Sequence, residues 1–329
     1  MQTVIAIDLG HSAVKLSSRK SDGSLLNLTV PSFVCPAFQL SDETAQSRAD
    51  LETVTVDGKP YFFGETARIQ GQMKNPVGSY DDWITSTEHT VLLLGSIKLA
   101  ASQGVDVENP WLVLGLPTHL FLRQKDVLKN FVLGFLKTDK IQVMPQPVGA
   151  YQATMLDEQG IQVANRNIPG QTWGVVDIGY YTTDFLVVEN GEFIEDAMGA
   201  CSGMRKASER MVKLLTKRGI SSDIQEAESS IQSRMIKNFG KSTDVGLEVD
   251  QALAKTIAEV IDSLGRLMSS YARKMDGLIV AGGGAHMIYP AIHEKYPTAV
   301  LAHNSRFAVA EGMRRFGTAV QRIQSMVSA

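Results

Sequence analysis

The chain has 329 residues, of which 44% are hydrophobic and 20% are charged. This balance argues against a disordered or fibrous chain, and the length favours two domains at roughly 150 residues each. The formal net charge of −3 gives no overall attraction for nucleic acid, so we expect no direct nucleic-acid binding. Two cysteines form neither a disulfide framework nor a clustered metal site.

The N-terminal residues MQTVIAIDLG lack the basic region, apolar segment and cleavage site of a secretory signal. No apolar run reaches the roughly 18 residues that span a bilayer. We therefore expect a cytoplasmic protein without a membrane partner. The segment 309–327 mixes arginines with Met and Phe, and a docked terminal helix is favoured there over a weak amphipathic membrane helix.

In the first half of the chain, apolar runs alternate with turn residues. The run Val4–Ile7 predicts a buried strand that ends at Asp8-Leu9-Gly10, and residues 13–17 predict its antiparallel partner. The polar stretch 21–82 predicts a small inserted subdomain with a hairpin turn at Asp57-Gly58. The other predicted elements are strands at 53–56, 61–63 and 111–116, and helices at 84–103 and 121–136.

The pattern restarts near residue 171. It predicts strands at 173–177, 183–188, 192–195 and 278–281, and helices at 202–218, 223–235 and 250–274. One small design occurs twice, because a strand ends in Asp-x-Gly at Asp8 and again at Asp177, and each turn leads to an antiparallel return strand. We expect two related α/β halves with a cleft between the two acidic turns.

The first turn carries groups suited to phosphate. Gly10 allows close approach of the backbone, Ser12 adds a hydroxyl, and Lys15 places a positive charge against β- and γ-phosphate oxygens. Asp8 is suited to hold Mg²⁺ through water, because Mg²⁺ dehydrates reluctantly. Taken alone, the motif also fits a plain β-hairpin with a solvated lysine.

The second turn repeats this chemistry. Asp177 offers a carboxylate for metal or water, Gly179 permits close approach, and Thr182 offers a hydroxyl. Asp184 orients either the hairpin or the metal shell, and Tyr180-Tyr181 also fits simple packing. The two turns together are more informative than either alone, because phosphoryl transfer needs charge positioned from several sides.

A third element joins an apolar strand to Gly282, Gly283 and Gly284. Three glycines let a backbone pass flat against a nucleoside or an α-phosphate, although they also form plain loops. The sequence contains no G-x-x-x-x-G-K-[ST], which disfavours a P-loop NTPase. It has no G-x-G-x-x-G after the first strand, which weakens a dinucleotide-binding interpretation.

The order of these motifs resembles the actin, sugar-kinase and heat-shock ATPase superfamily, and within it the bacterial ParM/StbA plasmid-segregation proteins. Residues 144–151 (MPQPVGAY) are similar to that family's first interdomain crossing, and residues 304–313 to its second. The stretch 61–65 (YFFGE) fits its inserted subdomain. The resemblance covers nearly the whole chain as an ordered set of motifs.

This resemblance implies an actin-like (ribonuclease H-like) fold with two related domains around a nucleotide cleft. Domain I would comprise residues 1–148, with the inserted subdomain 31–80 and a C-terminal helix 308–329, and domain II would comprise 149–307. It also implies ATP (possibly GTP) and Mg²⁺ as cofactors. Hydrolysis would control polar filaments, which a DNA-binding adaptor protein would link to plasmid DNA.

Carried over to matching positions, the resemblance makes Gln146 the residue that positions the attacking water, although Gln146 also fits a polar helix cap. Asp177 would assist that water, and Asp8 and Asp177 would hold Mg²⁺. The base-binding helix would begin near Gly203, although Lys206 also fits a solvated basic face. The expected nucleotide-binding residues are Asp8, Gly10, His11, Ser12, Lys15, Gly179, Thr182, Gly203, Lys206, Gly282, Gly283 and Gly284.

Two positions depart from the family. Position 180 is tyrosine where many relatives have glycine, so Tyr180 must point away from the phosphates or the loop must sit farther back. Position 11 is histidine where small polar residues are common, and a packing or solvated role for His11 is favoured over a catalytic one. Three other functions remain open: a small-molecule kinase of the same superfamily, a chaperone-type ATPase, and a cell-shape or organelle-positioning filament.

Overall fold

Two mixed β-sheets organise the chain. The computed structural model describes residues 2–71, 82–138, 140–164, 166 and 170–327. The first sheet has five strands in the order β3-β2-β1-β7-β8, in which β1 pairs with β2 antiparallel and with β7 parallel. Its strands are β1 (Val4–Leu9), β2 (Ala13–Arg19), β3 (Leu25–Pro31), β7 (Trp111–Leu116) and β8 (Ile141–Pro145).

The second sheet repeats this arrangement. Its order is β11-β10-β9-β15-β16, with β12 also paired to β10, so that β9 has an antiparallel neighbour on one side and a parallel neighbour on the other. Its strands are β9 (Thr172–Ile178), β10 (Thr182–Glu189), β11 (Glu192–Phe193), β12 (Gly199–Ser202), β15 (Gly277–Ala281) and β16 (Ala299–Leu301). The predicted repeat of two related halves is therefore confirmed in the topology.

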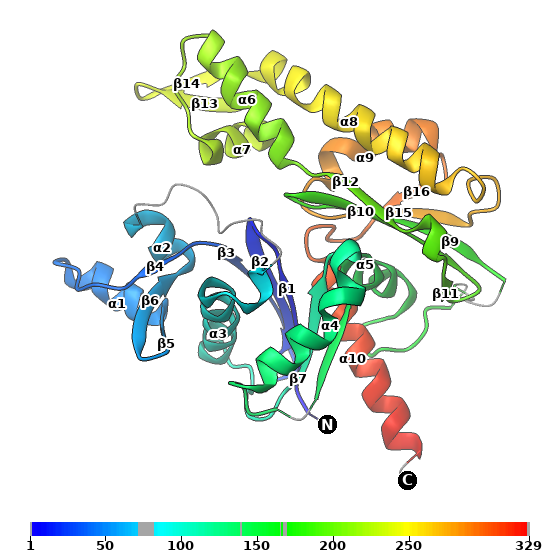
Figure 1. Ribbon diagram of the computed structural model, residues 1–329, viewed down its shortest axis with the longest axis horizontal. Helices are drawn as coiled ribbons and strands as arrows, with labels where there is room; N and C mark the ends of the chain where they lie inside the picture. The colour runs from blue at the N-terminus through cyan, green and yellow to red at the C-terminus, as the bar shows by residue number, and fades with distance from the viewer. Residues whose placement is uncertain (1, 72–81, 139, 165, 167–169, 328–329) are drawn as a thin grey trace.

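Helices cover both faces of each sheet (Figure 1). The outer face of the first sheet carries η1 (Trp83–Thr85), α3 (Thr87–Ser102) and α4 (Thr118–Leu133). Around the second sheet lie η2 (Glu195–Ala197), α8 (Gly246–Met268) and α9 (Ala285–Lys295), whereas α6 (Arg205–Lys217) packs on α8 and on α7 (Ile224–Ser233) to one side of the sheet. Between the two sheets lie α5 (Gln146–Met155) and α10 (Ala308–Val327).

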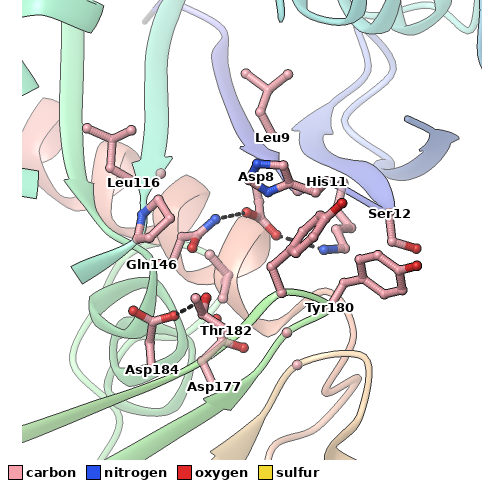
Figure 2. A pocket seen from close by; sticks show the side chains of 18 of the residues that line it. Asp8, Leu9, His11, Ser12, Leu116, Gln146, Asp177, Tyr180, Thr182 and Asp184 are labelled. Carbon is pink, nitrogen blue, oxygen red and sulfur yellow. Dashed lines mark hydrogen bonds and ion pairs between the residues drawn. The ribbon is translucent and has the colours of Figure 1, made fainter. Parts of the chain in front are cut away.

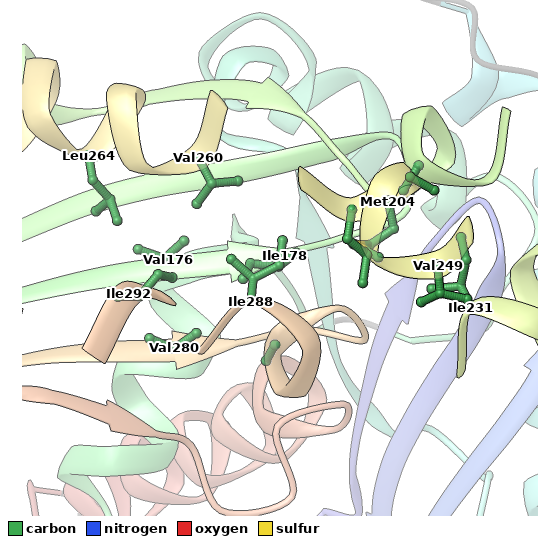
Figure 3. Packing of buried hydrophobic residues seen from close by; sticks show 14 of the residues in the cluster. Val176, Ile178, Met204, Ile231, Val249, Val260, Leu264, Val280, Ile288 and Ile292 are labelled. Carbon is green, nitrogen blue, oxygen red and sulfur yellow. The ribbon is translucent and has the colours of Figure 1, made fainter. Parts of the chain in front are cut away.

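The central strands are buried on both faces, as the apolar run at the start of the chain predicts. Side chains alternate along a strand, so Ile5 and Ile7 of β1 enter the outer core of the first half, whereas Val4 and Ala6 enter the core shared with the second sheet. In β9, Val176 and Ile178 enter the outer core (Figure 3). Three apolar cores therefore hold the β1–β2 and β9–β10 hairpins in place.

The two helices between the sheets touch through glycine. A Cβ at Gly149 of α5 would lie 2.5 Å from the Val309 carbonyl oxygen of α10. A Cβ at Gly312 of α10 would overlap the Gly149 carbonyl oxygen. The C-terminal segment is therefore a docked helix. Among the described residues, no helix has the length and apolar character needed to cross a membrane.

The inserted stretch contains a three-stranded sheet, β4-β6-β5, with two short helices. The turn at Asp57-Gly58 has φ values of 50° and 74°, the left-handed pair that a tight hairpin turn requires. Residues 72–80 of the predicted insertion lie outside the described residues. The elements are β4 (Val34–Pro36), α1 (Glu43–Leu51), β5 (Thr53–Val56), β6 (Lys59–Phe63) and α2 (Gly64–Gln70).

Some elements differ from the prediction. The single helix expected over 84–103 is two pieces, because the Ser86 side chain accepts from the backbone N–H of His89 and begins α3 there. The helix expected to reach residue 235 ends at Ser233, where Arg234 adopts a left-handed conformation. A hairpin that the sequence did not reveal follows it: β13 (Met235–Asn238) and β14 (Lys241–Asp244).

Candidate functional site

The first hairpin, β1–β2, holds an ion pair at its turn. Asp8 and Lys15 are directly opposite in the antiparallel register, so their side chains share one face. The Lys15 Nζ lies 3.1 Å from the Asp8 Oδ2. Gly10 is required between them, since a Cβ there would lie 2.8 Å from the Ala13 carbonyl oxygen and 3.0 Å from the Lys15 Nζ.

The second hairpin, β9–β10, uses the same geometry with different side chains. Asp177 is opposite Asp184, so two carboxylates replace the Asp–Lys pair. Gly179 closes the turn with its N–H 2.9 Å from the Thr182 carbonyl oxygen. The Thr182 hydroxyl donates to Asp184 at 2.7 Å.

The two hairpins face one cavity of about 180 Å³ (Figure 2). Asp8 comes from the first sheet and Asp177 from the second, and both are nearly buried, with 5% and 8% of their surface exposed. The cavity is the cleft that the repeated Asp-x-Gly turns predict. Most of the expected site residues line it: Asp8, Gly10, His11, Ser12, Lys15, Gln146, Asp177, Gly179, Thr182, Gly282 and Gly283.

Gln146 binds the first hairpin directly. It is the first residue of α5, after the β8 strand, and its side-chain amide donates to the Asp8 Oδ1 at 2.6 Å. Gly115 of β7 leaves room for it, because a Cβ there would lie 3.1 Å from the Gln146 Cγ. Gln146 is therefore fixed beside the carboxylate with its amide carbon at the edge of the cavity.

Asp177 is held in an electrostatically unfavourable position. Burial, together with the nearby carboxylates of Asp8 and Asp184, raises the pKa of this carboxyl to about 7, against a smaller opposing effect of Lys15. A carboxyl with this pKa takes up or releases a proton near neutral pH. It is therefore suited to general acid–base chemistry and gains stability from any cation placed in the cavity.

Asp184 connects the two halves of the molecule. Besides the bond from Thr182, its Oδ1 accepts the backbone N–H of Thr118 at the start of α4, at 3.0 Å. Burial is the main reason that the pKa of Asp184 is raised. Of the two roles the sequence left open for Asp184, these contacts support orientation of the hairpin.

The three consecutive glycines lie against the second hairpin. Gly282 has φ of 94°, and a Cβ there would lie 2.6 Å from an Asp177 carboxylate oxygen. A Cβ at Gly284 would lie 2.6 Å from side-chain atoms of Ile178 and Met204, whereas Gly283 faces open space. Larger side chains at the first and third positions would displace the second hairpin.

A second cavity, of about 440 Å³, adjoins the first. Ser12, Lys15, Gly179, Tyr180 and Gly283 line both cavities, so the two form one continuous hollow with a narrow charged end and a wider end. The wider end lies among α6, α7 and α9 and the three glycines. Arg306 also lines both cavities, and the other lining residues of the wider end include Met204, Ser208, Glu228, Ile231, Gly284 and Met287.

The two departures at positions 11 and 180 form an aromatic cluster at the cavity. The His11 ring stacks on Trp83, with centroids 5.2 Å apart, and meets the edge of Tyr181 at 4.7 Å. Burial lowers the pKa of His11 to about 4, so the ring is neutral at pH 7. Tyr180 lines both cavities. These contacts support the packing role for His11.

Gly203 and Lys206 stand apart from the other expected site residues. Gly203 supports the second hairpin from behind, because its N–H donates to the Tyr181 carbonyl oxygen at 2.8 Å and a Cβ would meet Tyr180. The Lys206 side chain is 56% exposed and pairs with Glu209, and it lines neither cavity.

Two family models match the chain. Residues 6–149 match "Actin like proteins N terminal domain", and residues 175–294 match "Archaeal actin homologue MreB-like, C-terminal". Both halves of the chain therefore match domains of actin-like proteins. No curated protein matches it.

Solved structures share the actin-like fold over nearly the whole chain. A 15-stranded ParM filament from Clostridium botulinum is 22% identical, with a TM-score of 0.75, and the match covers 96% of this chain and 99% of the other. A non-polymerisable ParM quadruple mutant, also 22% identical, has a TM-score of 0.76 with the same coverage. An archaeal actin homologue in complex with ADP is 19% identical, with a TM-score of 0.71 and coverage of 97% and 99%.

Sequence reasoning missed several lining residues of this actin-like protein. Glu228 of α7 accepts from the Ser12 hydroxyl at 3.2 Å, and Arg306 lies close enough to Glu228 to affect its titration. Trp83 and His89 border the narrow cavity, and burial lowers the pKa of His89 to about 3. None of these residues belongs to a glycine-rich turn. The hydrophobic pattern of a strand or helix predicts that a residue is buried or exposed, but it does not predict which distant residues lie next to it.

The carboxylates of the cavity fit a hydrated divalent cation better than a metal bound by protein alone. Among the described residues, no group of three or more His, Cys, Asp and Glu side chains has the geometry to hold a metal. Asp8 and Asp177 instead leave ligand positions for water and phosphate oxygens, which is the coordination that Mg²⁺ favours in phosphoryl-transfer sites.

Proposed function

We propose that this actin-like chain is an ATPase whose nucleotide state controls its assembly into polar filaments. The observation that carries the proposal is the pair of opposed carboxylates, Asp8 and Asp177, from related hairpins in one cavity. The ADP complex and the filament among the similar structures support this assignment. ATP is the proposed substrate, with GTP as the alternative nucleotide.

The narrow end of the hollow suits the triphosphate. Lys15, the Ser12 hydroxyl and the backbone N–H groups of the two hairpins would bind phosphate oxygens. Gly10, His11, Gly179, Thr182 and Gly282 border the same space. The wider end suits the nucleoside, with Gly283 and Gly284 flat against it, whereas Gly203, just before α6, and Lys206, on α6, line neither cavity.

Hydrolysis requires a water in line with the γ-phosphate. Gln146 would position this water through its amide, and Asp177 would accept its proton, a role that suits a carboxyl with a pKa of about 7. Asp8 and Asp177 would hold Mg²⁺ through water. When bound, the ion neutralises phosphate charge.

The nucleotide would change the relation between the two halves. A γ-phosphate bound by both hairpins favours a closed cleft, and its loss removes contacts on both sides. Since α5 and α10 meet through Gly149 and Gly312, movement of one half relative to the other would act on this glycine contact. Hydrolysis would thus determine when the filaments disassemble.

The proposed biological role is segregation of plasmid DNA in the cytoplasm through a DNA-binding adaptor protein. The similar ParM structures support this role over a cell-shape or organelle-positioning filament. Deletion of the chain from its plasmid should lower plasmid retention, and a pull-down with plasmid partition DNA should recover the chain only when the adaptor is present.

Assembly and hydrolysis can be measured together. With ATP and Mg²⁺, light scattering should rise and then fall as phosphate is released, whereas a non-hydrolysable analogue should give lasting filaments in negative-stain images. ADP should give little assembly. Absence of scattering and of phosphate release with both ATP and GTP would refute the proposal. Phosphate transfer to a small-molecule acceptor without filaments would favour a kinase.

A further inference from the structure

We infer that the tip of the β13–β14 hairpin binds an acidic, apolar groove on a second copy of this chain. The "aromatic tip" is Lys237-Asn238-Phe239-Gly240-Lys241, and the "acidic groove" is the hollow between α4, β8, α5 and β11. The inference rests on the proposed filament function and assigns the surfaces that would join successive subunits.

Phe239 is fully exposed and conformationally unfavourable at the same time. Its exposed fraction is 100%, and its φ of 45° lies in the left-handed region that favours Asn or Gly. Gly240 follows with φ of 81°, so the pair forms the tight turn in which an Asn-Gly sequence would be more stable. A phenylalanine there serves neither the turn nor an intramolecular core, which points to contact with another molecule.

The acidic groove is suited to receive this ring. It has a volume of about 450 Å³, whereas a cavity of roughly 150 Å³ holds a benzene molecule. Apolar side chains dominate its lining, among them Leu122, Phe193, Met198 and Phe316. Leu122 and Phe193 are also 70% and 42% exposed, so burial by a partner would remove apolar surface from water.

Charge complementarity selects the occupant. Lys237 and Lys241 are exposed on either side of Phe239. Glu195 lines the groove, and Glu192 and Asp196 are exposed next to the lining residues Phe193 and Glu195 in the chain. The inserted subdomain also has an exposed aromatic residue, Phe38, but its residues 41–57 contain five carboxylates and one arginine. Like charges would therefore oppose the subdomain at the groove, whereas the basic tip is attracted to it.

The two surfaces lie apart on the molecule, because α4 and α5, which border the groove, lie near its middle and β13–β14 at one extremity. Figure 1 shows β13–β14 at the upper left and β11 toward the right, along the long axis. A contact between two different surfaces of the same chain is heterologous, and it continues from subunit to subunit because each copy keeps one tip and one groove free. Such a contact forms an open polar filament when the rotation between successive copies does not close a ring.

The variant Phe239→Asn tests the tip without harming the fold, because Asn suits the left-handed turn. The critical concentration for sedimentation with a non-hydrolysable ATP analogue should rise at least tenfold, while ATP binding and thermal stability are retained. The matched control Ile323→Asn changes another exposed apolar residue, on α10, and should leave the critical concentration within twofold.

Charge reversal tests the pairing itself. Lys237→Glu with Lys241→Glu should prevent assembly, and so should Glu192→Lys with Glu195→Lys. All four changes in one chain should restore it, because tip and groove are again complementary. Reversal of the tip combined with Glu43→Lys and Glu294→Lys restores the net charge only, and should remain defective.

The outcomes separate this inference from the proposed function. If the wild-type chain assembles and Phe239→Asn assembles equally well, or if the four changes do not restore assembly, the tip–groove contact is wrong and the filament proposal stands. If the wild-type chain does not self-associate with any nucleotide, both are refuted. Loss of assembly in Phe239→Asn together with rescue by charge exchange supports the contact.

Discussion

The two hairpins share a backbone design and differ in the charges placed on it. In the first, Asp8 accepts from Lys15 and from the Gln146 amide, so its negative charge is compensated. In the second, the charges acting on Asp177 are chiefly the carboxylates of Asp8 and Asp184, which raise its pKa together with burial. The duplicated fold therefore gives one hairpin suited to bind a phosphate group and one suited to exchange a proton.

The largest expected effect separates these two roles. Asp177→Asn should lower phosphate release by a factor of about 10²–10⁴, because the proton acceptor is lost, and filaments should persist longer. Nucleotide affinity should stay within about threefold. Asp8→Asn removes the partner of Lys15 and should weaken nucleotide binding by about tenfold or more.

Single-turnover phosphate release and fluorescent-nucleotide titration measure the two quantities independently. Equal loss of affinity in both variants would show that the hairpins act alike. Unchanged turnover in Asp177→Asn would remove this residue from the catalytic group.

The next effect concerns stability and pH in the nucleotide-free protein. Because folding raises the pKa of Asp177 from 3.8 to about 7, the folded chain holds a proton that the unfolded chain releases, and stability from this group falls as pH rises from about 4 to 7. The full change is at most about 4 kcal/mol at 1.36 kcal/mol per pKa unit. Asp177→Asn should abolish this dependence.

Urea unfolding of both proteins between pH 5 and 8 measures the difference. The comparison with the variant is needed because folding lowers the pKa of His11 and His89, and these groups give stability that rises with pH below about 6.5. A wild-type minus variant difference that stays constant with pH would contradict the burial argument.

The third prediction tests the glycine contact between α5 and α10, the two helices that lie between the sheets. Gly312→Ala would force α10 away from the Gly149 carbonyl oxygen, at a cost of about 1–3 kcal/mol or more in unfolding free energy. Gly265→Ala on α8 is the matched control, because a Cβ there meets nothing within 4 Å and alanine favours a helix by about 1 kcal/mol. Chemical unfolding should therefore give opposite signs for the two variants, and equal signs would contradict the close approach.

Sequence reasoning located both hairpins because each combines an apolar strand with an Asp-x-Gly turn, and both signals are local. It missed β3, β8 and the β13–β14 hairpin, whose residues alternate weakly and gain their pairing from neighbours distant in the chain. For the site, the turns carried the information. The position of Lys206 could not be predicted in this way. The buried residues Ala207, Met211 and Leu215 determine which face of α6 is turned to the core, and this leaves Lys206 on the exposed face beside Glu209.

The smallest effect concerns the hydroxyl groups of the two hairpins. Ser12 donates across the cleft to Glu228, which is largely buried, whereas Thr182 donates to Asp184 within its own half. Ser12→Ala should lower the unfolding free energy of the nucleotide-free protein by about 1 kcal/mol, the usual net value of one hydrogen bond. Thr182→Val, which leaves a fully buried carboxyl without this donor, should cost about 1–3 kcal/mol.

The Ser12 change should alter the relation between the two halves directly, because its own bond to Glu228 crosses between them, whereas in Thr182→Val the crossing bond from Thr118 to Asp184 is retained. In hydrogen exchange, Ser12→Ala should increase exchange in α7, where Glu228 loses its partner, whereas Thr182→Val should act on β10. Exposed Ser47 of α1 gives a control, since Ser47→Ala should leave both segments unchanged. Faster exchange in α7 with Thr182→Val and not with Ser12→Ala would contradict the role of the Ser12–Glu228 bond in holding α7.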